Sequence, residues 1–276
     1  MQRLNIKELI NIDYDFVNDG TSAMYLATNP YNNKTGILKK NGCMLGVTNE
    51  DLREKLASTI INMCGIDTAL IELCIDDNGT KYALSYNVLK ENQKHIELSP
   101  VIIKSTIKEE IWKEYIRKIS ASIMCLPQIN LEQYLNIRKR ILELHFMDVI
   151  IDHYDRKVDN NKIIYDENTK QYLPTIGYDY GIAFCPNKTN GIFNFLTNEE
   201  VMHFLIKFHY NDLEFLIKNT RTTLNENTLN LILSQEQYQA LDTNEIHNQL
   251  RRRLNQLDSI LMGQSIETTI EQQKTI

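Results

Sequence analysis

The stretch 148–184 places the strongest constraint on this chain, because polar residues and short strand patterns follow one another there in a fixed order. It reads as an apolar run, a polar loop, the strand pattern KIIYD, a turn, and a second apolar run into Asp179-Tyr180-Gly181. The loop has the spacing His153-x-Asp155-x-x-x-x-Asn160. Carboxylate and amide oxygens are the ligands that Mg²⁺ prefers. The stretch therefore predicts a metal-assisted site in which Asp155 accepts a proton while Asn160 and Asp179 bind metal.

Asp and Asn residues also cap turns in polar loops, and this competing interpretation applies to each of them singly. We favour turn capping for three neighbours of the motif, Asp152, Asp159 and Asn161. His153 is interpreted as a structural residue that holds the loop by hydrogen bonding. The combination of Asp155, Asn160 and Asp179 favours a functional role, with Gly181 allowing a sharp turn after Asp179.

Phosphoryl transfer also needs a cation on the phosphates, and the N-terminal third offers one. Lys39 ends a strand pattern, and Glu54 lies on the helix pattern that follows. Lys40 competes with Lys39, because neighbouring strand residues point to opposite faces and only one lysine can enter a binding site. Thr21 and Ser22 follow the turn signal Asn-Asp-Gly, and they are candidate phosphate contacts through hydroxyl and backbone N–H groups.

The pattern of elements predicts an α+β fold with two lobes. Residues 1–88 read as a meander (13–17, 23–27 and 35–39), a helix that begins at Thr48-Asn49-Glu50 and ends at Gly65, and a hairpin whose turn is Asn78-Gly79. The pattern loosens over 87–100, which predicts a hinge. Residues 89–276 read as mostly helical, with helices over 109–124, 131–151, 197–208, 212–218, 228–233 and 243–261, and a polar tail from 264 that frays.

Composition excludes several classes of function. The net charge of −6 over 276 residues argues against nucleic-acid binding, and Arg251–Arg253 is interpreted as a solvated helix face. Five scattered cysteines without CxxC spacing indicate free buried thiols in a reducing compartment. No apolar run has the length of a membrane span, and the start is unlike a signal peptide. We therefore expect a cytoplasmic protein that does not contact membranes.

The order of the motifs matches the catalytic loop and metal loop of protein kinases. More narrowly, Asp155-Arg-x-x-x-Asn160 followed by Asp179-x-Gly181 resembles the HipA-like serine/threonine kinases of the protein-kinase-like superfamily. The segment 53–66, with Glu54 near its start and Gly-aliphatic at its end, resembles the family's helix. The chain is similar in size to compact stand-alone members, and its glycine loop is degenerate.

The resemblance implies a bilobal kinase-like fold, with ATP and Mg²⁺ as cofactors and adenine near Tyr86–Leu89. It implies Asp155 as catalytic base, Asn160 and Asp179 as Mg²⁺ ligands, Lys39 as phosphate anchor and Glu54 as its partner. The expected acceptor is a Ser or Thr hydroxyl of a protein, including the chain's own Thr21 or Ser22.

Two alternatives stay open. A small-molecule phosphotransferase of the aminoglycoside or choline type has the same His-x-Asp-x-x-x-x-Asn spacing, although an acidic residue usually stands where this chain has Gly181. A pseudokinase that binds nucleotide without turnover is the other alternative. The presence of every required side chain counts against it, and the degenerate glycine loop keeps it open.

Overall fold

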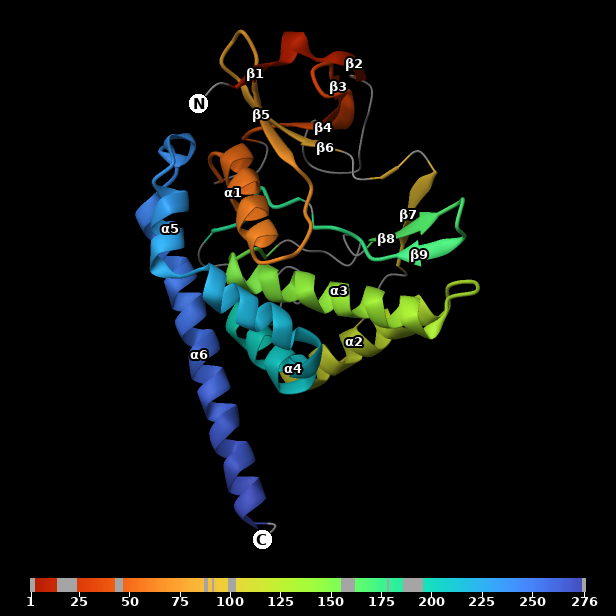
Figure 1. The fold of residues 1–276 in the computed structure, drawn as a ribbon, viewed down its shortest axis with the longest axis vertical. Helices are drawn as coiled ribbons and strands as arrows, with labels where there is room; N and C mark the ends of the chain where they lie inside the picture. Colours follow the sequence, from red (N-terminus) through yellow and green to blue (C-terminus); the bar gives the residue numbers. More distant parts are fainter. Residues whose placement is uncertain are drawn as a thin grey trace. The chain divides into compact units, whose positions relative to one another are not determined.

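The computed structural model places strands in the N-terminal third and helices in most of the remainder (Figure 1). It describes residues 3–13, 24–42, 47–86, 89–90, 92–98, 103–154, 162–177, 179–185 and 196–274, the last eleven of these by their backbone. The mixed α+β fold expected from the sequence is confirmed. No helix in these ranges is long and apolar enough to cross a membrane.

Six strands form one sheet in the order β1-β5-β6-β4-β3-β2. They are β1 (Leu4–Asn5), β2 (Ile10–Asp13), β3 (Met24–Asn29), β4 (Lys34–Lys40), β5 (Ile71–Ile75) and β6 (Lys81–Tyr86). The predicted strands 23–27 and 35–39 are confirmed as β3 and β4, which pair antiparallel. The strand predicted at 13–17 lies outside the described residues except for Asp13, the last residue of β2, and β2 pairs antiparallel with β3. The predicted hairpin is confirmed as β5 and β6, with Gly79 at φ 81° in its turn. Strand β1, which pairs in parallel with β5, was not predicted.

One face of this sheet buries an apolar cluster that includes Leu38, Leu84 and Tyr86. Gly36 lies where β4 passes so close to β6 that a Cβ atom would stand 2.5 Å from the carbonyl oxygen of Ser85. Only glycine fits this position without moving the strands apart.

Helix α1 (Glu50–Met63) packs against β5 and β6. Its start and end agree with the prediction, since Gly65 follows it in the left-handed conformation at φ 92°. Leu56 and Ile60 are fully buried on its inner face. Glu54 is buried on the same helix at 2% exposure, which marks it as a charge that requires partners.

A second sheet contains β7 (Gln93–Glu97), β8 (Lys162–Asp166) and β9 (Gln171–Leu173), all antiparallel. The hairpin β8-β9 was predicted. Strand β7 lies in the region that the sequence analysis interpreted as a loosened hinge, so that interpretation is wrong for 93–97. The strand pattern there is weak because Ile96 is its only apolar residue.

The helices are α2 (Lys108–Met124), α3 (Leu131–Ile150), α4 (Asn198–Thr223), α5 (Glu226–Leu233) and α6 (Thr243–Lys274), with short 3-10 turns at Ile6–Glu8 and Glu236–Tyr238. The two helices predicted at 197–208 and 212–218 are confirmed as the two parts of α4, which meet at a kink at His209 (φ −135°, ψ 19°). The predicted end of the last helix needs correction. Helix α6 continues to Lys274, beyond the predicted end at 261, because Gly263 is tolerated inside a helix at a modest cost.

Contacts divide the chain into two compact units, and each is made of separate segments. The first contains Met1–Lys90, Ile176–Cys185 and Thr223–Glu245. The second contains Glu91–Thr175, Pro186–Thr222 and Ile246–Ile276. The predicted lobe boundary after residue 88 stays a prediction. All four described cysteines are free thiols, and two of them, Cys64 and Cys74, are buried, whereas Cys125 is exposed.

Candidate functional site

Three residues that the sequence selected separately meet inside the first unit. The Nζ atom of Lys39 lies 2.5 Å from Oδ1 of Asp179 and 3.9 Å from Oε1 of Glu54. The side chain of Glu54 is 3% exposed and that of Lys39 17%, whereas that of Asp179 is 44% exposed. A buried carboxylate thus lies on one side of the ammonium group, and a solvent-accessible carboxylate lies on the other.

Strand register decides which of the two lysines enters this site. Lys39 pairs with Ala83 and Lys40 pairs with Tyr82. Tyr82 belongs to the apolar cluster on the opposite face of the sheet, so Lys40 points away from the site. Lys40 is exposed at the end of β4. The choice between the lysines, which alternation alone could not make, follows from these pairs.

The segment that carries Asp179 is attached to the flanks of α1 at both of its ends. On one side, Gly177 donates its N–H to the Asp67 carbonyl at 3.0 Å and accepts from the Ala69 N–H at 2.8 Å. On the other side, Nη1 of Arg53 donates to the carbonyl oxygens of Ala183 and Phe184, both at 3.0 Å. Asp179 is therefore held by backbone contacts that do not depend on its own side chain.

Asp179 has a left-handed backbone with φ 63°, and Phe184 has φ 60°. Such values are uncommon outside glycine, and residues held in them cluster at functional sites. Gly181 does not have positive φ, and a Cβ atom there would meet Glu50 Cβ at an ordinary 3.6 Å. The sequence analysis assigned the sharp turn to Gly181, and this is wrong, because Asp179 itself adopts the left-handed conformation.

Tyr86 opens the segment that the resemblance places near adenine. Its hydroxyl accepts from Asn29 Nδ2 at 2.7 Å and from Asn32 Nδ2 at 3.1 Å, and donates to Glu72. The residue is 4% exposed and belongs to the apolar cluster on the face opposite Lys39. The ring of Tyr86 is therefore part of the sheet core and is not available to a base, and Asn87 and Val88 lie outside the described residues.

The loop predicted to hold the catalytic base is described at its beginning only. His153 is 2% exposed, and its Nδ1 lies 3.3 Å from Oδ1 of the buried Asp148. The backbone N–H of His153 donates to the backbone carbonyl of Asp148 at 2.8 Å, which agrees with the structural role expected for His153. The predicted base Asp155, the predicted ligand Asn160, and Thr21 and Ser22 lie outside the described residues.

Asp152 corrects two interpretations at once. The sequence analysis treated it as a turn cap and Arg251–Arg253 as a solvated face. In the structure Asp152 is 4% exposed, and its carboxylate accepts from Asn198 Nδ2 at 3.1 Å, from Arg252 Nη2 at 3.1 Å and from Arg253 Nε at 2.7 Å. Arg253, at 11% exposure, therefore forms a largely buried ion pair with Asp152. Arg251 and Arg252 are exposed, so the solvated-face interpretation is wrong for Arg253 alone.

The described part of the site offers one carboxylate, that of Asp179, that suits Mg²⁺. Asp179 offers an accessible carboxylate, which is the ligand type that Mg²⁺ takes in phosphate-binding sites. In the described part of the chain, no three His, Cys, Asp or Glu side chains gather as a metal site. A Mg²⁺ site at Asp179 would therefore use few protein ligands together with phosphate oxygens, which is the usual pattern for this ion.

Comparisons with known proteins place the fold. The chain matches no protein-family model and no curated protein. Among solved structures it is similar to the crystal structure of a Helicobacter pylori proinflammatory kinase, CtkA, with a TM-score of 0.68 and 12% identity over 96% of this chain and 99% of that one. A Golgi casein kinase is a more distant match, with a TM-score of 0.44 and 13% identity over 91% of this chain and 73% of that one. The likeness to CtkA shows that the chain has a kinase-like fold.

Arg53 and the Asp152 cluster were missed by sequence reasoning. Arg53 precedes Glu54 on α1, and its role depends on the carbonyls of Ala183 and Phe184, which no local pattern indicates. One signal was available for Asp152: an acidic residue beside a predicted catalytic loop, together with a run of three arginines, could have been tested as a pair.

Proposed function

We propose that this chain is an ATP-dependent phosphotransferase, a HipA-like protein serine/threonine kinase that transfers the γ-phosphate of ATP to a hydroxyl of a protein substrate. The observation that supports it most is the convergence of Lys39, Glu54 and Asp179, with Lys39 Nζ at 2.5 Å from Asp179 and 3.9 Å from Glu54. These residues come from a strand, a helix and a loop, and each was selected by its place in a kinase-like motif. The kinase-like fold agrees with this reaction.

The roles follow from charge and exposure. Lys39 would contact the phosphates, and the buried Glu54 carboxylate would keep its ammonium group in place. Asp179 and Asn160 would hold Mg²⁺, which neutralises phosphate charge. Asp155 would orient the acceptor hydroxyl and accept its proton. Lys39 forms ion pairs with both Asp179 and Glu54.

The two lysines provide a matched test. Purified protein is incubated with γ-labelled ATP, Mg²⁺ and a generic acceptor such as myelin basic protein, beside Lys39→Met and Lys40→Met. We expect labelling to fall about 100-fold or more in Lys39→Met, as when one transition-state contact is removed, and to stay within about twofold of wild type in Lys40→Met. Asp155→Ala and Asp179→Ala should lose labelling as Lys39→Met does.

Other outcomes distinguish the alternatives. If wild type gives no label and ATP with Mg²⁺ still raises the melting temperature, a pseudokinase is favoured, unless aminoglycosides or choline accept the label. Equal labelling by Lys39→Met and wild type would contradict the role of Lys39. The absence of both label and ATP-dependent stabilisation would contradict the proposal as a whole.

Autophosphorylation at Thr21 or Ser22 is a separate expectation. A mass spectrum of the protein after incubation with ATP and Mg²⁺ should show added phosphate on the peptide that contains them. Phosphate elsewhere, or none, would remove this expectation without affecting transfer to another protein.

A further inference from the structure

Asp152 lies three residues before the predicted catalytic base, and it joins three elements of the second unit. It follows α3, it accepts from Asn198 at the start of α4, and it accepts from Arg252 and Arg253 on α6. Arg253 donates to Oδ1 of Asp152 through both Nε, at 2.7 Å, and Nη2, whereas Arg252 donates to Oδ2 at 3.1 Å. The two oxygens are thus bound by different arginines through charge-assisted hydrogen bonds, which fix the direction of the carboxylate as well as its position.

The two arginines that contact Asp152 differ in how far they are buried. The side chain of Asp152 is 4% exposed and that of Arg253 is 11% exposed, whereas that of Arg252 is 52% exposed. A buried carboxylate costs several kcal/mol unless it is paired and hydrogen-bonded. Loss of Arg253 would therefore leave the buried carboxylate with Asn198 and the more exposed Arg252 as its described partners, while loss of Arg252 would be compensated in part by water.

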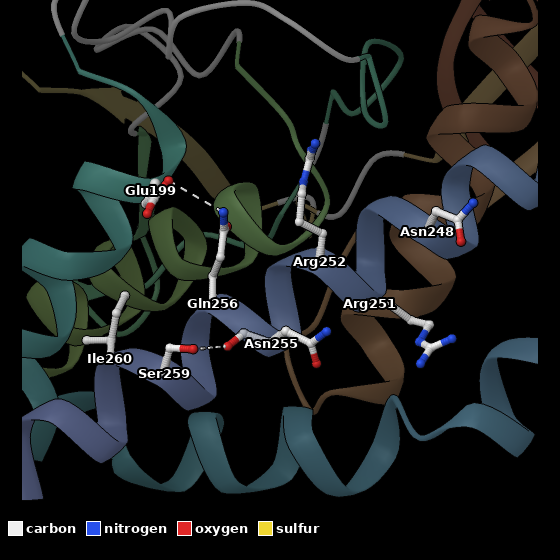
Figure 2. A pocket seen from close by; sticks show the side chains of 8 residues that line it. All are labelled: Glu199, Asn248, Arg251, Arg252, Asn255, Gln256, Ser259 and Ile260. Carbon is white, nitrogen blue, oxygen red and sulfur yellow. Dashed lines mark hydrogen bonds between the residues drawn. The ribbon is translucent and has the colours of Figure 1, made fainter.

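Arg253 is itself held in place. Its Nη1 donates to Oε1 of Gln256 at 2.8 Å, and Nε2 of Gln256 lies 3.5 Å from Oε2 of Glu199 on α4. Figure 2 shows Gln256 of α6 directed toward Glu199. The path Asp152–Arg253–Gln256–Glu199 thus connects the end of α3 with α6 and the first turn of α4.

The backbone at Asp152 points to the same role. Its φ is 50°, a conformation that glycine adopts most easily and that Asp and Asn tolerate better than other residues. A glycine here would remove the strain but would also remove the carboxylate. The strained conformation leads directly into His153 and Tyr154, which are 2% and 8% exposed.

We propose that Asp152 and Arg253 form a positioning pair that fixes the start of the catalytic loop to α6. The pair does not touch the reacting atoms, and its effect on rate would come from holding the residues that follow. This inference rests on the proposed function for its kinetic test, and it has a second test that needs no activity.

The kinetic test uses the variants Arg253→Gln, Arg253→Lys and Asp152→Asn. Asparagine is chosen at position 152 because it keeps the size of the side chain and tolerates positive φ. We expect kcat to fall about tenfold or more, because a misplacement of about 1 Å can cost about 100-fold. The Kd for ATP measured without Mg²⁺ should stay within about threefold, because Lys39 and Glu54 are unchanged. Arg253→Lys, which keeps the charge without the paired geometry, should lie between wild type and Arg253→Gln.

The control is Arg221→Gln. Arg221 of α4 pairs with Asp258 of α6 at 2.7 Å, and both side chains are partly exposed. This variant removes another Arg–Asp pair between the same two helices, away from the loop. Because this pair is exposed, its loss should lower the melting temperature little. An Asp152–Arg253 pair that served only to hold α6 would lower the melting temperature and leave kcat unchanged in the folded fraction.

Hydrogen exchange provides the second test. The amides of 152–160 should exchange faster in Arg253→Gln than in wild type and should be unchanged in Arg221→Gln. If wild type has no activity, the proposed function fails, and this measurement alone decides on the positioning pair. Unchanged kcat in a folded Asp152→Asn or Arg253→Lys, or unchanged exchange of the loop, would overturn the inference.

Discussion

His209 makes the stability of the second unit depend on pH in the acid range. It lies at the kink of α4, and its Nδ1 is 3.2 Å from Nη2 of Arg138. Because a guanidinium group only donates, Nδ1 accepts and the ring is neutral. Burial, and next the charge of Arg138, lower the pKa of His209 from 6.5 to about 4, although Asp212 acts in the opposite direction.

The sign of the pH dependence follows from this lowered pKa. Above pH 6.5 the ring is neutral in both the folded and the unfolded chain. Between pH 6.5 and about 4 the unfolded chain takes up a proton that the folded chain does not, so the free energy of unfolding falls as the pH falls. We expect His209→Gln, which does not titrate, to lose less melting temperature between pH 7 and pH 4.5 than wild type. Equal losses would contradict a neutral buried His209.

The choice between Lys39 and Lys40 marks what sequence can decide at the scale of a residue. Alternation places the two on opposite faces, but it does not say which face meets the site. That depends on the pairing of β4 with β6, which puts Lys39 opposite Ala83. This pairing joins strands that lie far apart in the sequence, so local sequence patterns do not reveal it.

At the scale of elements, the attachment of 176–185 to α1 depends on the space around Gly177. A Cβ atom there would stand 2.2 Å from the hydroxyl of Tyr180, whose side chain is fully buried and cannot move aside. A Cβ atom at Gly181 would meet neighbours no closer than 3.6 Å. The two glycines of this segment therefore differ in what they tolerate.

We expect Gly177→Ala to lower the free energy of unfolding by about 1–3 kcal/mol, as overpacking does, and Gly181→Ala to change it by about 0.5 kcal/mol or less. Adding Tyr180→Phe removes the clashing oxygen, so the double variant Gly177→Ala/Tyr180→Phe should recover part of the loss. Urea denaturation measures all four proteins. A loss in Gly181→Ala equal to that in Gly177→Ala would contradict this packing.

Elements with strong local signals were predicted, and those that depend on a partner were not. The hairpin turn at Asn78-Gly79, the helix ending before Gly65 and the helical faces of α2 and α3 were found from sequence. Strand β7 is polar except for Ile96, and it is a strand because β8 pairs with it. The kink at His209 separates the two helices that the patterns on either side of it predicted.

At the scale of the whole molecule, the first unit is assembled from three stretches of chain. Hydrogen bonds between Gly177 and the 67–69 turn carry part of this assembly. Elements that open together exchange their amide hydrogens with the same free energy. The unit should therefore behave as one cooperative element in spite of its separation in sequence.

We expect the amides of Ala69 and Gly177 to show the same opening free energy as those of β5 and β6 in native-state hydrogen exchange under increasing denaturant. The three groups should respond in parallel, because opening one breaks its pair in the other. Exchange of Gly177 at much lower free energy than the strands would show that 176–185 opens separately.

The segmented first unit has a consequence for synthesis. A ribosome releases the strands of the sheet early, but Ile176–Cys185 follows only after Glu91–Thr175 of the second unit has been made, and Thr223–Glu245 follows later still. The face of the sheet that carries Lys39 cannot acquire Asp179 until then. The nascent chain thus carries an incomplete first unit while it makes segments of the second.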